Sequence, residues 1–202
     1  MGTDIELREL AAPSFVHALP ALLEVYTAAM DPAPGQLPGR RSIMEQHSRY
    51  PRFRSVLALA PDGGAAGFAY GFQGRSGQWW HDVVTAELKR SDPDALRRWF
   101  TDSFEIAEVH VHPVYQGRGA GRRLLERLAQ ARPERTAVLS TPVGPTVARR
   151  LYASCGFADV LPEFAFPGSP DRPFAIMAAP LPLAGGGRRR AAGRSRGWRW
   201  TG

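Results

Sequence analysis

The chain has 202 residues, of which 44% are hydrophobic and 22% charged, and it contains a single cysteine, Cys155. This composition is typical of a folded globular protein and excludes an intrinsically disordered chain and a disulfide-rich secreted one. The formal net charge is +7, but six of the positive charges are arginines within residues 184–202, and removing these six leaves about +1 for the remainder. The basicity therefore belongs to the C-terminal segment and not to the body of the protein.

Hydrophobic periodicity and turn residues predict strands and helices along the whole body of the chain. In chain order we expect a strand over 5–10, helices over 15–30 and 40–50, strands over 54–60 and 65–72, two short helices within 75–103, a strand over 104–113, a helix after a glycine-rich loop, a strand over 136–141, a helix over 146–157, and strands near 158–166 and 173–181. Pro20 is expected to kink the first helix or to mark its start. This order predicts a mixed α/β sheet with helices packed against it.

The chain is expected to form one domain over residues 1–183, followed by a disordered Arg/Gly-rich tail over 184–202. The arginines and two tryptophans of the tail could bind nucleic acid or an anionic membrane, but a solvated extension is the simpler interpretation. The acidic N-terminal segment does not resemble a secretory signal, and the sequence has no run of 18 apolar residues. We therefore expect a cytoplasmic protein without a membrane partner, and nucleic acid only through the tail.

Residues 116–122, Gln-Gly-Arg-Gly-Ala-Gly-Arg, follow a predicted strand and run directly into a predicted helix. Glycines let a phosphate group lie against the backbone, and the N–H groups at a helix N-terminus favour anions. A dinucleotide fingerprint needs glycine where Arg122 stands, and a Walker A loop needs Lys followed by Ser or Thr, so both nucleotide patterns fail. What remains is a phosphate loop of another kind, or a simple turn.

Two segments resemble the GNAT superfamily of N-acetyltransferases, in the form found in actinobacteria. Its acetyl-CoA signature is similar to Val109-x-Val111-x-Pro113-x-x-Gln116-x-x-Gly119-x-Gly121, and its A-x-x-L-Y-x-x-x-G-F segment is similar to residues 148–157. The resemblance implies a mostly antiparallel central sheet of about six to seven strands, splayed at the coenzyme strand and flanked by helices. Pro145 departs from the family, many members of which carry an asparagine that contacts the pantetheine arm.

The resemblance implies an acyltransferase that moves an acetyl group from acetyl-CoA to a primary amine of a small molecule or protein. The residues expected at the coenzyme are Val109, Val111, Gln116, Gly117, Arg118, Gly119, Ala120, Gly121 and Arg122. Tyr152 is expected to protonate the departing thiolate, because a phenol with a pKa near ~10 can protonate a thiolate whose thiol has a pKa near ~8.5. The alternatives are a core tyrosine and a non-catalytic acyl-CoA-binding module.

The base that takes the proton of the amine is left open between Glu105, Glu108 and a water relay. Some family members use a glutamate eleven residues before the motif glutamine, which is Glu105 here. If side chains alternate strictly along the strand, Glu105 shares a face with Val109 and Val111, and Glu108 shares the other face with His110 and His112. A bulge in the strand would break this alternation. Either carboxylate could also be structural.

Other polar residues carry weaker signals. His110 and His112 alternate on one strand without a third ligand nearby in sequence, so we expect no metal site. Cys155 is expected to be a small buried residue. Residues 78–82, Gln-Trp-Trp-His-Asp, could form a wall of the acceptor site or pack into the core. The protein is expected to be a monomer or a homodimer.

Overall fold

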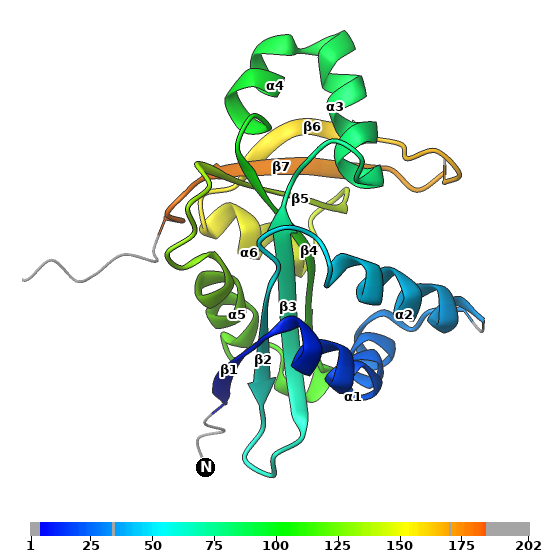
Figure 1. Ribbon diagram of the computed structural model, residues 1–202, viewed down its shortest axis with the longest axis vertical. Coiled ribbons are helices and arrows are strands. Elements are labelled where there is room, and N and C mark those ends of the chain that lie inside the picture. The colour runs from blue at the N-terminus through cyan, green and yellow to red at the C-terminus, as the bar shows by residue number, and fades with distance from the viewer. Residues whose placement is uncertain (1–4, 34, 170, 185–202) are drawn as a thin grey trace, which may run out of the picture.

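The computed structural model describes residues 5–33, 35–169 and 171–184, and it forms seven strands, six α-helices and a short 3-10 turn within them (Figure 1). The strands are β1 (Glu6–Leu10), β2 (Arg54–Leu59), β3 (Ala65–Gln73), β4 (Ser103–Val111), β5 (Thr136–Pro142), β6 (Ala158–Phe164) and β7 (Phe174–Pro180). The helices are α1 (Ala12–Met30), α2 (Gln36–His47), α3 (Trp79–Ser91), α4 (Pro93–Trp99), α5 (Ala120–Ala129) and α6 (Val147–Ser154), and η1 (Pro113–Tyr115) precedes α5. None of these helices combines the length and hydropathy that a membrane crossing requires. Of the tail expected over 184–202, residues 185–202 lie outside the described residues.

All seven strands belong to one sheet in the order β1-β2-β3-β4-β5-β7-β6. Neighbouring strands are antiparallel except β4 and β5, which run parallel. The predicted mixed α/β fold with a mostly antiparallel sheet of six to seven strands is therefore confirmed. Figure 1 shows β3 and β4 running at a steep angle to β6 and β7. Between these two halves of the sheet, β4 and β5 pair at only three positions.

Helices cover both faces of the sheet. On one face, Phe15 and Leu19 of α1 and Met44 of α2 pack against the β3 residues Phe68, Tyr70 and Phe72. The same face of the β5–β7 half is covered by α3 and α4, through Val84, Leu88 and Phe100 against Val138, Ile176 and Ala178. On the opposite face, α5 and α6 contribute Leu124, Leu125, Leu128, Tyr152 and Cys155 to a third cluster. The edges of β4 and β5 that part from each other thus lie between helices on both sides.

The N-terminal helices differ in extent from the sequence prediction. Pro20 lies inside α1, which runs on both sides of it, so this proline does not mark the start of the helix. The second helix begins at Gln36, four residues before its predicted start, and ends at His47. Pro38 explains the error, because proline is tolerated in the first turn of a helix, where its missing N–H would have no intrahelical partner. Sequence reasoning took that proline as part of a turn.

The parting of β4 from β5 is short and well defined. β4 pairs with β5 at three positions, Ser103 with Thr136, Phe104 with Ala137 and Glu105 with Val138. Beyond Glu105, five of the next six residues of β4 pair with β3, and this ladder continues to Val111 opposite Gly67. The β5 side of residues 106–111 is consequently an unpaired strand edge within the described structure.

We predict that Gly71→Ala destabilises the fold at this junction. A Cβ at Gly71 would lie 2.3 Å from the carbonyl oxygen of Glu105 and 2.7 Å from Cζ of Phe104, so the opposing β4 backbone would have to move. Overpacking of this kind costs about 1–3 kcal/mol, measurable by urea denaturation. Gly39→Ala in α2 is the control, since a Cβ there meets no atom within 4 Å and alanine favours a helix. Equal stabilities of the two variants would contradict the prediction.

Candidate active site

A bulge in β4 decides which way its polar side chains face. The register steps from Tyr70 opposite Glu108 to Gly71 opposite Ile106, so Ala107 has no partner on β3. Side chains of paired residues point to the same face of a sheet. Because Tyr70 belongs to the α1–α2 cluster, Glu108 faces those helices, whereas Val109 and Val111 pack on the α5–α6 side.

Glu105 lies on the same face as Glu108. Its neighbours in the sheet are Phe72 of β3 and Val138 of β5, which belong to the clusters under α1–α2 and under α3–α4 respectively. The bulge therefore breaks the strict alternation considered for this strand and brings both carboxylates to one face. Glu105 stands where β4 and β5 begin to part.

The surroundings of Glu105 keep its carboxyl group protonated at neutral pH. The side chain is buried, and its Oε2 atom has no hydrogen-bond partner among the described residues. Burial raises the pKa of Glu105 from 4.5 to about 8, because the charged form loses its hydration without gaining a counter-charge. A buried carboxyl with a pKa near the working pH is well suited to exchange a proton with a bound substrate.

Glu108, three residues further along, is held in the ionised form. Its Oε1 accepts a hydrogen bond of 2.6 Å from Nη1 of Arg40 on α2, and its Oε2 is hydrogen-bonded to Nε2 of His110. Burial alone would raise the pKa of Glu108, but the hydrogen bond from His110 and the charges of His110 and Arg40 outweigh it and lower the pKa. The two carboxylates of this strand are therefore in opposite protonation states at neutral pH.

The end of β4 presents a backbone donor to the gap between the strands. The N–H of His112 donates to the carbonyl of Ala66 on β3, and successive N–H groups of a strand point to opposite edges. The N–H of Val111 consequently points to the edge that β5 has left. The carbonyl of Val111, on that same edge, accepts a hydrogen bond of 2.9 Å from the side chain of Gln116. Gln116 thus fastens the strand end to the loop that follows.

The glycine-rich loop has the backbone shape expected of an anion site. Gly117 and Gly119 have φ values of 72° and 80°, and a Cβ at either position would meet no atom within 4 Å. Gly119 is the N-cap of α5, and the first intrahelical bond runs from Arg123 N–H to the Gly119 carbonyl. The N–H groups of residues 120–122 therefore point out of the helix end, where its dipole favours negative charge.

The remaining loop residues join α5 to its neighbours. A Cβ at Gly121 would lie 3.2 Å from Cδ2 of Leu151 on α6, so glycine permits close packing of the two helices. The Arg122 side chain hydrogen-bonds Oγ of Ser154 at 2.5 Å and pairs with Glu126. Arg118 lies between the two glycines of positive φ. Of the residues predicted to hold coenzyme, 116–122 are consecutive and are joined to Val111 by the Gln116 hydrogen bond. Val109 lies two residues before Val111 on β4.

Tyr152 is fixed in place by the end of α6. The N–H of Phe157 donates to the Tyr152 carbonyl and that of Gly156 to Ala153, the hydrogen-bond pair of a Schellman motif. Gly156 has a φ of 93°, and the rings of Phe157 and Tyr152 lie 5.9 Å apart. The Gly-Phe pair of the sequence motif therefore has a structural purpose, which is to end the helix one turn after Tyr152.

The phenol of Tyr152 is protonated over the whole physiological pH range. Burial raises the pKa of Tyr152 to about 12, and the negative charge of Glu108 adds to this effect. The influence of Glu108 shows that Tyr152 and the β4 carboxylate lie within electrostatic reach of each other, although they belong to different clusters. A buried phenol in this position is a proton donor and not a base.

The remaining candidates of the sequence differ in their surroundings, and the role of residues 78–82 at an acceptor site stays a prediction. Cys155 is buried in the core, and burial raises the pKa of its thiol. Within the described part of the chain, no three His, Cys, Asp or Glu side chains gather in a way that could hold a metal ion. In residues 78–82, Gln78 and His81 are buried and Trp80 donates from Nε1 to Oγ of Ser140, whereas Trp79 is 59% exposed.

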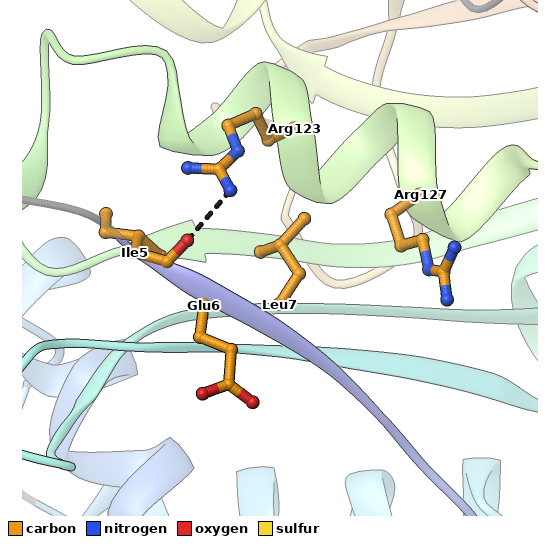
Figure 2. Close-up of a pocket in the computed structure, with 5 residues that line it drawn as sticks. All are labelled: Ile5, Glu6, Leu7, Arg123 and Arg127. Carbon is orange, nitrogen blue, oxygen red and sulfur yellow. Dashed lines mark hydrogen bonds between the residues drawn. The ribbon is translucent and has the colours of Figure 1, made fainter.

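A groove on the molecule lies away from these residues. Figure 2 shows it between β1 and α5, lined by Ile5, Glu6, Leu7, Arg123 and Arg127, with Arg123 donating a 2.8 Å hydrogen bond to the carbonyl of Ile5. β1 is the edge strand of the sheet, four positions from β5. None of the predicted catalytic or coenzyme residues lines this groove, so it is separate from the candidate site.

Sequence reasoning missed the residues that α1, α2 and β3 bring to this face. Arg40 contacts Glu108 from 68 residues away, and His47 Nδ1 lies 3.1 Å from the buried hydroxyl of Tyr70. Burial lowers the pKa of His47 to about 4, so its ring is neutral at physiological pH. No spacing in a single sequence marks these contacts, because they arise from packing between distant segments.

Comparison with known proteins finds a family whose domain model matches half of this chain. The model of the acetyltransferase (GNAT) domain matches residues 57–159, which span β2 to the start of β6. A GCN5-like protein acetyltransferase from Mycobacterium tuberculosis is 43% identical over 122 residues, which cover 58% of this chain and 59% of the relative. The matched region therefore spans about three fifths of the length of that relative.

Solved structures share the fold at low sequence identity. A GNAT-family protein from Desulfovibrio desulfuricans superposes with a TM-score of 0.62 at 15% identity, covering 88% of this chain and 99% of that protein. The protein yncA from Salmonella typhimurium was crystallised with acetyl-CoA as its cofactor. It superposes with a TM-score of 0.58 at 21% identity, over 89% of this chain and 95% of yncA. These likenesses establish a common fold.

We predict that Glu105→Gln stabilises the protein in a pH-dependent way. Unfolded Glu105 ionises near 4.5 but folded Glu105 near 8, so the wild type loses stability as the pH rises from about 5 to about 8. The variant lacks this loss, and its advantage grows across that window to on the order of a few kcal/mol. Urea denaturation at pH 5, 6, 7 and 8 measures it. Glu163→Gln, at an exposed site on β6, is the control. A difference in unfolding free energy between Glu105→Gln and the wild type that does not change with pH would contradict the prediction.

Proposed function

We propose that this chain, which belongs to the GNAT acetyltransferase family, transfers an acetyl group from acetyl-CoA to a primary amine. Membership of the family rests on the domain match over residues 57–159. The observation that supports the proposal is the unpaired end of β4, which begins after Glu105 and runs into the glycine-rich loop at the start of α5. Tyr152 lies in the helix layer of α5 and α6 on one face of that strand. The acetyl-CoA complex of the Salmonella neighbour supports the choice of donor.

The loop residues fit the coenzyme. The N–H groups of residues 120–122 would hold the pyrophosphate at the start of α5, and Gly117 and Gly119 let it lie against the backbone. Arg118 and the backbone of Arg122 belong to the same cradle. The N–H of Val111, at the unpaired edge of β4, would donate to the thioester carbonyl oxygen, where negative charge develops during the reaction. Val109 forms the strand edge beside the pantetheine arm.

Glu105 is proposed to take the proton of the acceptor amine. An alkylammonium ion must lose a proton before its nitrogen can attack, and a carboxylate with a pKa of about 8 accepts that proton more readily than one with an ordinary pKa. Glu108 is already engaged with Arg40 and His110, so it is proposed to hold its charge rather than to act as base. Turnover should accordingly rise with pH through about 8.

Tyr152 is proposed to protonate the leaving thiolate. As the new C–N bond forms and the C–S bond breaks, the sulfur gains a negative charge that a nearby phenol can neutralise. The ammonium ion gives one proton to Glu105 before its nitrogen attacks. The tetrahedral intermediate then loses a second proton from nitrogen to water as the C–S bond breaks, while Tyr152 gives its proton to sulfur. Tyr152 afterwards regains a proton from water, and Glu105 releases its proton to water. Burial of Tyr152 keeps the phenol protonated until the thiolate appears.

A protein amine is a second class of acceptor for this chain. The mycobacterial relative is named a protein acetyltransferase and is 43% identical over the matched region. An acyl-CoA-binding module without catalysis is the alternative to both.

The proposal is tested by following free thiol release from acetyl-CoA with a panel of small amines and lysine peptides. We expect turnover with at least one amine, and we expect Tyr152→Phe to lower kcat by about 10- to 100-fold while the dissociation constant of acetyl-CoA stays unchanged. Calorimetry measures that constant separately. Tight coenzyme binding without turnover on any amine would favour the binding module instead.

We also predict that Gly119→Glu weakens coenzyme binding. A carboxylate would stand at the N-terminus of α5 where the pyrophosphate is proposed to lie, and the two negative charges would repel. Gly63→Glu is a matched control, because Gly63 has a φ of 84° and open space around it but lies in the β2–β3 turn. The acetyl-CoA dissociation constant should rise at least ~10-fold in the first variant only. An equal rise in both would reflect backbone strain alone.

A further inference from the structure

Four residues from three elements form a charged cluster beside the proposed site. Arg40 of α2 donates to Glu108 of β4 at 2.6 Å, and its guanidinium carbon lies 4.9 Å from the ring centre of Tyr26 on α1. His110 of β4 is hydrogen-bonded to Glu108 and packs edge-on against Tyr26. These residues, called the Arg40 cluster below, do not belong to the acid, the base or the coenzyme loop.

The positive charge of the Arg40 cluster is its outermost group. The side chain of Arg40 is 33% exposed, whereas those of Glu108 and His110 are 11% and 10% exposed. A molecule approaching from solvent therefore meets the guanidinium first, with the carboxylate beneath it. Arginine carries five N–H donors in a planar fork, and Glu108 occupies Nη1. The fork is held by Glu108 on one side and by the Tyr26 ring on its face.

The Arg40 cluster lies within reach of the reacting atoms. Glu108 faces the same side of β4 as Glu105, three residues away, which is about 10 Å along an extended strand and less across the bulge at Ala107. The charge of Glu108 also acts on Tyr152. A substrate whose amine lies at Glu105 and whose chain runs along β4 toward Glu108 would reach Arg40 within a few bonds.

We propose that Arg40 binds a carboxylate of the acceptor, so that the enzyme prefers amines carrying an anionic group within roughly 10 Å of the nitrogen. This inference rests on the proposed function. An anion would bind the outer edge of a guanidinium whose inner edge is already neutralised and oriented by Glu108. Arg40 acts here as a specificity residue, and the carboxylate can come from a small amino acid or from an acidic residue beside a lysine in a peptide.

The competing interpretation is that the Arg40–Glu108 pair only fastens α2 to the sheet. Met44 is the buried residue of α2, and His47 adds its contact with Tyr70. Loss of a fastening would impair all acceptors alike, whereas loss of a carboxylate-binding residue changes the ratio between charged and neutral acceptors. That ratio is therefore the quantity to measure.

The experiment uses acceptor pairs that differ in one carboxylate. 6-Aminohexanoate is compared with hexylamine, and a peptide with glutamate beside its lysine is compared with the same peptide carrying glutamine. For the wild type we expect a higher kcat/KM with the carboxylate member of at least one pair, and which pair responds identifies the source of the anion. Arg40→Gln should lower that preference about 10- to 100-fold, because charge-assisted hydrogen bonds to the carboxylate are lost. The change should be mainly a higher KM for the carboxylate acceptor. Arg40→Lys should restore part of the preference.

Two further variants keep the test decisive. Arg40→Gln leaves Glu108 without its guanidinium partner, so the double variant Arg40→Gln/Glu108→Gln removes both charges and should also lose the preference. Arg41→Gln is the matched control, since Arg41 sits next in α2 and pairs with the nearby Glu45, and it should keep the wild-type preference. Circular dichroism confirms folding of each variant.

The outcomes separate this inference from the proposed function. Equal kcat/KM for the two members of both pairs in the wild type, or a preference that survives in Arg40→Gln and in the double variant, would overturn the role of Arg40 while leaving amine acetylation intact. No acetylation of any of the four acceptors or of the wider amine panel, despite coenzyme binding, would overturn the proposed function itself.

Discussion

The parting of β4 from β5 after Glu105 is the constraint on which the site depends. Three paired positions hold the two strands together, and beyond them the ladder on this side of β4 ends. Backbone groups that a continuous sheet would use internally, such as the N–H of Val111, are thereby left for a ligand. The helices on the two faces approach the gap from opposite sides, α5 and α6 from one and α1 to α4 from the other. A donor and an acceptor can therefore meet in the gap from opposite faces.

Local hydrogen bonds hold the segments beside the gap between β4 and β5 in place. Gln116 ties its amide to the Val111 carbonyl, and the Schellman motif at Gly156 fixes the end of α6. Arg122 links α5 to α6 through Ser154. Each of these contacts joins residues of the two recognised motifs to one another or to their own strand and helix ends. The motifs thus specify a backbone shape as much as a set of reactive groups.

The parts of this structure that sequence could predict are those governed by local rules. The hairpin at residues 60–64, the N-cap at Asp92 and the C-terminal glycine at Gly156 follow from residue types whose backbone preferences are strong. The bulge at Ala107 had to be left open, because alanine carries no signal for it and its cause is the pairing with β3. Arg40 and His47 were missed for the same reason, since their partners Glu108 and Tyr70 lie in other elements.

The two glutamates of β4 show how one strand can supply groups of opposite character. Their side chains are chemically equal, face the same side of the sheet and are both almost inaccessible to water. Glu105 meets Phe72 and Val138 and has no counter-charge, so neutrality is its lower-energy state, whereas Glu108 meets Arg40 and His110 and stays charged. Environments that drive two carboxyl pKa values apart are a common sign of divided roles at an active site. The difference between the two pKa values follows from the neighbours of each side chain. Arg40 of α2 supplies a positive charge to Glu108, whereas Glu105 lies beside the apolar residues Phe72 and Val138. The placement of α2 beside the bulge therefore decides which of the two carboxyl groups is neutral and which one is charged.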